Sequence, residues 1–357
     1  MVESANLVKV QNLTVCYETI GGTITALDNV NLGIREGELL AVVGESGCGK
    51  STLALAMIGL LPNPPARVPN GAIEYKGTDL VSLAPKQMRE YRGTQIAMIF
   101  QEPLSSLNPV YKVGDQIAEA VTIRRHRKDG HVSPQSDFMQ KTHRVNPPGV
   151  TRLPRLGRKL SGDLRSEVID FLKLVRIPDP EQVMERYPFE LSGGMRQRIM
   201  IAMALSQEPA LLIADEPTTA LDVTTQAQVL KLMKELMDKV KTSILLITHD
   251  LAVACQVADR VAVMYAGDIV EAADVYDLFS NALHPYTQGL LSCLPTGSKH
   301  ETDLKPIPGS VSDLRTRITG CKFTPRCPYA MTICSERKPR LIEIKQNHEV
   351  ACYLHGE

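Results

Sequence analysis

Gly44-Glu45-Ser46-Gly47-Cys48-Gly49-Lys50-Ser51 follows an apolar run at residues 39–43 and precedes a helix-like segment that starts at Thr52. This stretch matches the pattern G-x-x-x-x-G-K-[ST]. Its glycines let backbone amides converge on phosphate oxygens, the following helix N-terminus favours an anion, and Lys50 adds a positive charge. The Ser51 hydroxyl suits Mg²⁺. A glycine-rich turn without a ligand is the alternative, but the strand and helix around the loop favour a nucleotide site.

Two acids extend this prediction. Asp215 and Glu216 end an apolar run at residues 210–214, and a second apolar run lies at 243–247. Short continuous apolar runs indicate strands buried on both faces of a parallel sheet, whose ligands bind at the carboxyl ends of the strands. Asp215 is expected to hold Mg²⁺ through water and Glu216 to polarise an attacking water. Adjacent acids also occur in solvated turns, and the phosphate loop favours the functional interpretation.

The rest of the chain surrounds this core. Alternating residues at 8–34 with a Gly21-Gly22 turn predict a small antiparallel sheet, and residues 101–191 are mostly helix and loop. The predicted fold class is α/β: a P-loop NTPase (RecA-like) parallel-sheet core with an N-terminal antiparallel β-subdomain, a helical subdomain and a small cysteine-rich C-terminal extension. The expected boundaries are 1–100 with 209–280 for the core, 101–208 for the helical subdomain and 281–357 for the extension.

Composition limits the classes of function. The 357 residues include 40 Lys or Arg and 40 Asp or Glu, a formal net charge of zero, which argues against nucleic-acid binding through bulk charge. We expect a cytosolic chain, since no apolar run reaches the length of a spanning helix and the start lacks a secretory signal. Residues 124–159 hold ten Lys or Arg and two Asp, a net charge of +8. They predict a solvated insertion, with binding to anionic lipid or nucleic acid as the alternative.

Five separated motifs, taken in order, resemble those of the ATP-binding subunits of ABC transporters. Residues 191–197 resemble the family's signature loop, although L-S-G-G alone could equally be an ordinary capped helix. The resemblance implies a head-to-tail dimer with two ATP molecules, in which this loop completes the site on the opposite subunit. The signature residues are Leu191, Ser192, Gly193, Gly194, Met195, Arg196 and Gln197.

The resemblance also implies roles for single residues. Gln101 matches the glutamine loop, Asp222 the loop that communicates across the dimer, His249 the switch histidine, and Tyr17 the aromatic ring stacked on adenine. The expected catalytic residues are Glu216, His249 and Gln101. Mg²⁺ is expected on Ser51, Gln101 and Asp215. The expected ATP contacts are Tyr17, Gly44, Glu45, Ser46, Gly47, Cys48, Gly49, Lys50, Ser51, Thr52 and Asp215.

Within that family the chain looks most like the ATPases of oligopeptide, dipeptide and nickel importers. The similar stretches are F-Q-E-P-L-S-S-L-N-P-V, A-L-D-V-T-T-Q-A-Q, R-V-A-V-M-Y-A-G and L-H-P-Y-T. The resemblance implies the first of two unlike ATPase subunits, and so a heterodimer with a paralogous subunit. It also implies two transmembrane permease subunits, an extracytoplasmic solute-binding protein and a place on the cytoplasmic face of the membrane. Import of oligosaccharides or nickel, or a non-transport ABC ATPase acting on nucleic acid, are the alternatives.

Four of the eight cysteines lie near the end of the chain: Cys321, Cys327, Cys334 and Cys352. Their spacing lacks the tight pair typical of zinc sites, whereas iron–sulfur clusters tolerate irregular spacing. The tail resembles that of peptide-importer ATPases in which G-C-x-F-x-P-R-C-P holds a 4Fe-4S cluster. Such a cluster is the favoured prediction, with the role of stapling the tail, and zinc or free thiols remain open. Cys48, at a helix N-terminus, is expected to have a lowered thiol pKa, so that its alkylation impairs ATP binding.

Overall fold

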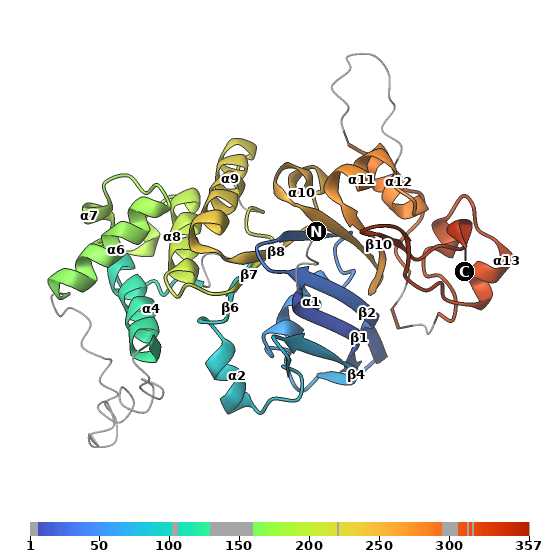
Figure 1. Ribbon diagram of the computed structural model, residues 1–357, viewed down its shortest axis with the longest axis horizontal. Helices are drawn as coiled ribbons and strands as arrows, with labels where there is room; N and C mark the ends of the chain where they lie inside the picture. Colours follow the sequence, from blue (N-terminus) through green and yellow to red (C-terminus); the bar gives the residue numbers. More distant parts are fainter. Residues whose placement is uncertain are drawn as a thin grey trace, which may run out of the picture. The chain divides into compact units, whose positions relative to one another are not determined.

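The structure, a computed structural model, describes residues 6–101, 106–128, 160–219, 221–294, 306–312, 314–315 and 318–356. The chain forms two compact units (Figure 1). Unit 1 comprises Met1–Tyr91, Ile213–Glu216 and Ser243–Glu357, and unit 2 comprises Arg92–Leu212 and Pro217–Thr242. The boundaries of the three parts expected from the sequence stay a prediction.

Unit 1 begins with an antiparallel sheet whose strand order is β2-β1-β4-β5. Its apolar side chains alternate along β1, where Val8, Leu13 and Val15 are fully buried, as expected of a sheet with one covered face. The hairpin closes where Thr19 pairs with Gly22, which confirms the predicted turn. The strands are β1 (Asn6–Thr19), β2 (Gly22–Arg35), β4 (Ala66–Tyr75) and β5 (Thr78–Asp79).

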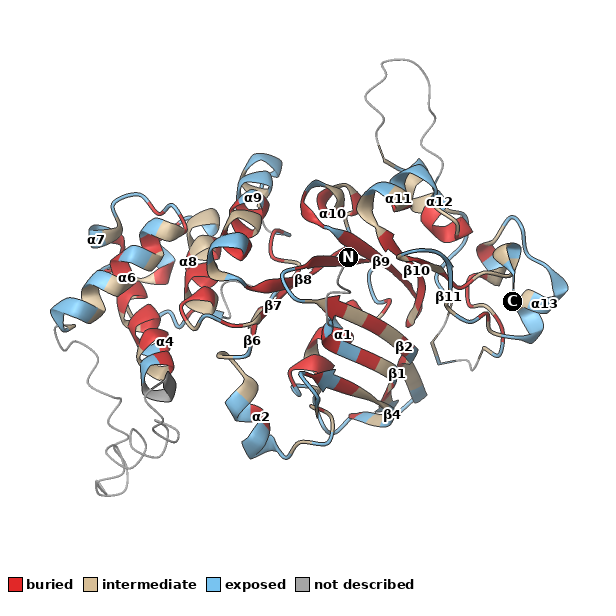
Figure 2. Ribbon diagram, in the orientation of Figure 1, coloured by how far each residue is buried: buried red, intermediate tan, exposed pale blue. Residues whose placement is uncertain are grey.

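The central sheet of unit 1 follows the order β11-β12-β10-β9-β3-β8-β7. Strand β3 runs parallel to both β8 and β9, and every residue of β3, β7, β8 and β9 is buried (Figure 2). This burial explains why the three predicted strands are unbroken apolar runs. The parallel strands and their neighbours are β3 (Leu39–Val43), β7 (Leu211–Asp215), β8 (Ser243–Thr248) and β9 (Arg260–Tyr265).

The C-terminal extension continues this sheet. Strand β10 (Asp268–Asp274) pairs antiparallel with β9 and with β12 (His348–Val350), which in turn pairs with β11 (Ile342–Lys345). The tail is therefore joined to the core by backbone hydrogen bonds. The helices of unit 1 are α1 (Lys50–Met57), α2 (Pro85–Tyr91), α10 (Leu251–Val257), α11 (Val275–Ser280), α12 (Pro285–Ser292) and α13 (Thr332–Glu336).

Unit 2 is mainly helical. Val168 and Leu172 on α6 are fully buried, and α6 ends at Leu174, shortly before Arg176, whose φ angle of 58° is left-handed, as is common after the last helical residue. Among the residues that the structure describes in either unit, no helix has the length and apolar character needed to cross a bilayer. The elements of unit 2 are β6 (Ile96–Ile99), α4 (Val113–Lys128), α6 (Gly162–Leu174), α7 (Pro180–Val183), α8 (Gly193–Leu205) and α9 (Val223–Val240).

The predicted basic insertion at 124–159 begins too early. Residues 124–128 complete α4, and the Arg124 side chain is buried in ion pairs with Glu167 and Glu208. Arg124 is therefore a structural cation of the helical unit, because a buried charge needs paired carboxylates. Residues 129–159 lie outside the described part of the chain.

Candidate nucleotide-binding site

The phosphate loop joins β3 to α1 in unit 1. Gly47 and Gly49 have φ angles of 80° and 109°, in the left-handed region that favours glycine. A side chain at Gly44 would lie 2.1 Å from the carbonyl oxygen of Met264. The glycines of the motif are thus required by the backbone path, and this path places Ser46 and Gly47 at the surface.

Lys50 is held inside the loop. Its residue is 5% exposed, and Nζ donates to the carbonyl oxygens of Gly44 at 2.8 Å and Glu45 at 3.0 Å. The ammonium group therefore lies at the base of the loop, at the N-terminus of α1. An anion bound by the loop amides would meet both this charge and the helix dipole.

Cys48 corrects a prediction. Its residue is 1% exposed, and burial raises the pKa of its thiol above the usual value. The nearby Lys50 Nζ, 3.7 Å from Sγ, acts in the opposite direction but is outweighed. The expectation of a lowered pKa was wrong because desolvation of a buried thiolate exceeds the help of the helix N-terminus.

Ser51 and Asp215 meet where β7 ends. The Ser51 hydroxyl donates to Oδ1 of Asp215 at 3.1 Å. Burial raises the pKa of Asp215, while the Ser51 hydrogen bond and the charge of Lys50 partly lower it. In the described part of the chain no group of three or more His, Cys, Asp or Glu residues is arranged to hold a metal ion. A hydroxyl and one carboxylate nevertheless suit Mg²⁺, which binds few protein ligands beside substrate phosphates.

Glu216 and His249 lie at the ends of the neighbouring strands β7 and β8. Oε1 of Glu216 is 3.3 Å from Nδ1 of His249, and the Glu216 amide donates to the Ile247 carbonyl at 2.9 Å. Glu216 has a φ angle of 46°, a strained conformation for a non-glycine residue, of the kind found at functional sites. We name the loop 44–51 together with Asp215, Glu216 and His249 the nucleotide edge.

Tyr17 also reaches this region. It lies in β1, is half-buried, and its hydroxyl is 3.4 Å from Oγ1 of Thr52 on α1. The antiparallel sheet therefore places an aromatic ring beside the helix that follows the phosphate loop.

Unit 2 carries the other predicted residues. Ser192 is exposed and caps α8, where its Oγ accepts the Met195 amide at 3.4 Å, and Asp222 caps α9 by accepting the Thr225 amide at 3.0 Å. A side chain at Gly194 would come within 2.9 Å of Thr225, which explains the second glycine.

The remaining residues of unit 2 differ in exposure. Gln101 is exposed just after β6. Of the signature residues, Leu191 and Gln197 are buried in unit 2, and Nε of Arg196 donates to the Pro188 carbonyl. The exposed part of the signature is therefore Ser192 and Gly193.

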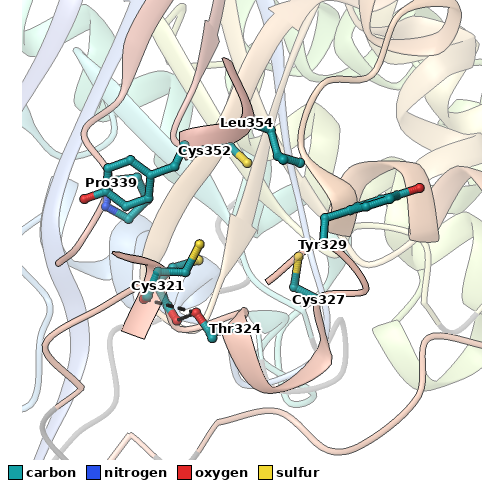
Figure 3. Close-up of a pocket in the computed structure, with 9 residues that line it drawn as sticks. Cys321, Thr324, Cys327, Tyr329, Pro339, Cys352 and Leu354 are labelled. Carbon is teal, nitrogen blue, oxygen red and sulfur yellow. Dashed lines mark hydrogen bonds between the residues drawn. The ribbon is translucent and has the colours of Figure 1, made fainter. Parts of the chain in front are cut away.

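The four C-terminal cysteines line one pocket of unit 1. Figure 3 shows the sulfur atoms of Cys321, Cys327 and Cys352 directed into a common space, and Cys334 completes the lining. The Cys321 amide donates to the Cys334 carbonyl at 2.7 Å, and burial raises the pKa of Cys321 to about 11. We call this space the cysteine pocket; it is lined by Cys321, Thr324, Cys327, Tyr329, Cys334, Pro339, Cys352, Tyr353 and Leu354.

Two polar contacts to the phosphate loop were not predicted. Arg326 pairs with the Glu45 carboxylate, and the Tyr286 hydroxyl accepts the Glu45 amide. The one signal in the sequence was the acid itself, because a carboxylate inside an anion-binding loop calls for a cation. Nothing in the sequence identifies that cation 281 positions away.

The fold and the nucleotide edge together define a P-loop protein with carboxylates at the end of a strand beside the phosphate loop. The profile of the family described as "ABC transporter" matches residues 27–219, and that of the "Oligopeptide/dipeptide transporter, C-terminal region" matches residues 270–334. The chain belongs to the ABC transporter family and is an ATPase coupled to transport.

Relatives match along nearly the whole chain. A probable peptide ABC transporter ATP-binding protein, y4tR of Sinorhizobium fredii, is 44% identical over 98% of this chain and 96% of its own length. The dipeptide transport ATP-binding protein DppD of Bacillus subtilis is 45% identical over 98% of this chain and 95% of its own. The oligopeptide transport protein OppD of the same organism is 44% identical over 99% and 90%.

Solved structures share the cassette. A dimeric ATP-binding cassette in a post-hydrolysis state, bound to ADP and phosphate, is 25% identical with a TM-score of 0.57, over 75% of this chain and 98% of its own. The cassette cbiO1 of Clostridium perfringens, part of an ABC transporter complex, is 25% identical with a TM-score of 0.58, over 77% and 91%. These likenesses confirm the predicted fold class.

Proposed function

We propose that this chain is the ATP-hydrolysing subunit of an importer for oligopeptides or dipeptides. The observation that carries the proposal is the nucleotide edge, where Ser51 meets Asp215 and Glu216 meets His249 at the ends of adjacent strands. The printed functions of the relatives, dipeptide and oligopeptide transport, support the cargo class.

The residues of the nucleotide edge, together with Tyr17 and Gln101, have separate roles in binding and hydrolysing ATP. The loop amides and Lys50 bind the phosphates of ATP, with Tyr17 against the base. Ser51, Asp215 and Gln101 hold Mg²⁺, which neutralises charge on the phosphates when bound. Glu216 orients the attacking water, and the 3.3 Å contact with His249 keeps its carboxylate in position near the γ-phosphate.

The active unit in this proposal is a head-to-tail dimer. Ser192 and Gly193 are exposed at the start of α8, so that a helix N-terminus faces the phosphates on the other subunit. Support comes from the dimeric cassette bound to ADP and phosphate. We propose a paralogous ATPase as the partner, with Asp222 in the loop that communicates between the two.

The dimer acts on two permease subunits at the cytoplasmic face of the membrane, supplied by an extracytoplasmic solute-binding protein. Closure on ATP and reopening after hydrolysis drive the permeases between their two states. If a solute-binding protein is encoded beside this chain, its ligand would identify the cargo. An oligosaccharide or nickel ligand there would replace peptides in this proposal.

The substitution Glu216→Gln tests the hydrolytic role. Hydrolysis should fall at least about 100-fold, because a positioned general base contributes that much, while ATP binding is retained and the dimer is stabilised. Glu36→Gln, the same chemical change on an exposed acid, is the matched control and should hydrolyse ATP normally. Normal turnover in the Glu216 variant would overturn the assignment.

We also propose that the cysteine pocket holds a 4Fe-4S cluster that staples the tail. Four cysteines line this one pocket, and iron–sulfur clusters tolerate irregular ligand spacing, whereas the tight cysteine pair typical of zinc sites is missing from the sequence of this segment. Anaerobic protein should contain iron and acid-labile sulfide in equal amounts. Cys327→Ser should lose both, and Cys293→Ser, outside the pocket, should keep them. Stoichiometric zinc, or four free thiols without metal, would reject the cluster.

A further inference from the structure

Glu45, the second residue of the phosphate loop, is held at three points. Its carboxylate receives two parallel hydrogen bonds from Arg326, Nη1 to Oε2 at 2.9 Å and Nη2 to Oε1 at 3.1 Å. Its amide donates to the Tyr286 hydroxyl at 3.1 Å. Its carbonyl accepts from Lys50 Nζ at 3.0 Å. Two of these contacts come from the region 270–334 that distinguishes this branch of the family.

Arg326 is itself fixed. Its residue is 8% exposed, Nε donates to the Pro308 carbonyl at 2.9 Å, and its guanidinium lies 5.7 Å from the centre of the Tyr265 ring and 5.9 Å from that of Phe323. A bidentate arginine held by packing and hydrogen bonds on its other side presents a rigid fork. It can therefore set the position of the Glu45 carboxylate rather than follow it.

The same segment is tied to the rest of unit 1 by two further cations. Nζ of Lys322 lies 3.0 Å from Asp268 and 3.2 Å from Asp28, and Nζ of Lys338 lies 2.8 Å and 2.9 Å from the same carboxylates. We call residues 321–338 the cysteine segment. Lys322 and Arg326 each adjoin a cysteine of the pocket, so the order of the pocket and the placement of these cations depend on each other.

We propose that Arg326 is a positioning residue for the nucleotide site, which couples the cysteine segment to ATP binding through Glu45. Arg326 neutralises a carboxylate that would otherwise repel polyphosphate, and it fixes the loop residue whose carbonyl holds Lys50. Because coupling between two sites is reciprocal, bound nucleotide must in turn stabilise the cysteine segment. The proposal rests on the ATP site, and it is independent of the transported solute and of what the cysteines bind.

The first test uses steady-state kinetics. In Arg326→Gln the unpaired Glu45 carboxylate should raise the KM for ATP about 10-fold, within the usual range of coupling, and leave kcat at saturating ATP within about twofold. Adding Glu45→Gln should lower the KM again at least about threefold relative to Arg326→Gln alone, because removing both partners leaves no unpaired charge. A KM that is unchanged in the single variant, or not rescued in the double variant, would overturn the proposal.

Lys345→Gln is the matched control. Lys345 lies in β11 of the same extension and pairs with Asp277 at 2.9 Å, so its loss weakens the tail without touching the phosphate loop. The KM of the Lys345→Gln variant for ATP should equal that of wild type. Arg326→Lys, which keeps the charge but not the fork, should fold and give an intermediate KM. A control variant with the same rise in KM as Arg326→Gln would show a general loss of stability instead.

The second test measures the reverse direction. Hydrogen exchange of residues 321–334 should slow several-fold when ADP and Mg²⁺ are added to wild type or Lys345→Gln, and should not respond in Arg326→Gln. This readout needs no turnover. Exchange in wild type that is insensitive to nucleotide would refute the coupling even if the KM of the variant rises.

Discussion

The nucleotide edge and the C-terminal extension lie in the same compact unit but are built in opposite ways. The edge consists of short motifs at the ends of parallel strands, where the fold gathers residues such as Ser51 and Asp215. The extension is held in place by single residues, Lys322, Arg326 and Lys338, whose partners lie far along the chain. The residues of the nucleotide edge thus lie in contiguous motifs, whereas the residues that hold the extension in place are scattered along the chain.

Lys50→Ala tests whether the nucleotide edge can lose its activity while the C-terminal extension stays intact. Loss of the ammonium group should lower kcat/KM for ATP at least about 100-fold, because a preorganised charge in a site is commonly worth that much. The metal content of the cysteine pocket should not change. Steady-state ATP hydrolysis and metal analysis would measure the two effects, with Lys9→Ala, at an exposed position of β1, as the control. Full turnover in Lys50→Ala would show that the motif residues of the nucleotide edge do not carry ATP hydrolysis.

His284 tests the stability of the C-terminal extension separately from the nucleotide edge. It caps α12, is 2% exposed, and burial, with the nearby His355, lowers its pKa from 6.5 to about 3. Between these two pKa values the unfolded chain binds a proton that the folded chain does not. The free energy of unfolding should therefore fall as pH drops below about 6.5, and the loss should continue toward about pH 3.

His284→Asn keeps a good helix cap and removes the titrating group. Between pH 6.5 and 5 the wild type should lose about 2 kcal/mol more stability than the variant, since each pKa unit is worth about 1.4 kcal/mol. Urea unfolding at the two pH values measures the difference. Equal acid sensitivity of the two proteins would mean that other groups dominate the acid response of the extension.

Much of the fold could be predicted because burial leaves its pattern in the residues. The runs at 39–43, 210–214 and 243–247 became β3, β7 and β8 with boundaries shifted by at most one residue at either end. Strands β11 and β12 could not be found this way. They are four and three residues long, and β11 is largely exposed, so they carry no apolar run.

The site divides in the same manner. Ser51, Asp215, Glu216 and His249 were selected from motifs, and the structure brings them together in two pairs. The pKa of Cys48 was mispredicted because sequence shows the helix N-terminus but not the depth of burial. Arg326 was missed because a basic residue in a tail looks the same whether it is solvated or buried against a distant acid.

Tyr17 tests how far the nucleotide edge reaches into the antiparallel sheet, and the expected effect is the smallest. Tyr17→Ala should raise the KM for ATP about 10-fold if its ring stacks on the base, since such stacking contributes about 1–3 kcal/mol. Tyr17→Phe keeps the ring and loses only the 3.4 Å contact with Thr52, so its KM should stay within about twofold of wild type.

The two variants together separate stacking from packing. An unchanged KM in Tyr17→Ala, with a lowered melting temperature, would make Tyr17 a packing residue of β1, so that the edge ends at α1. Equal losses of ATP affinity in Tyr17→Phe and Tyr17→Ala would instead assign the effect to the hydroxyl and its contact with Thr52. Only a raised KM in Tyr17→Ala together with a normal KM in Tyr17→Phe makes β1 part of the nucleotide edge. In that case the edge, like the extension, depends on a contact from outside the motifs at the strand ends.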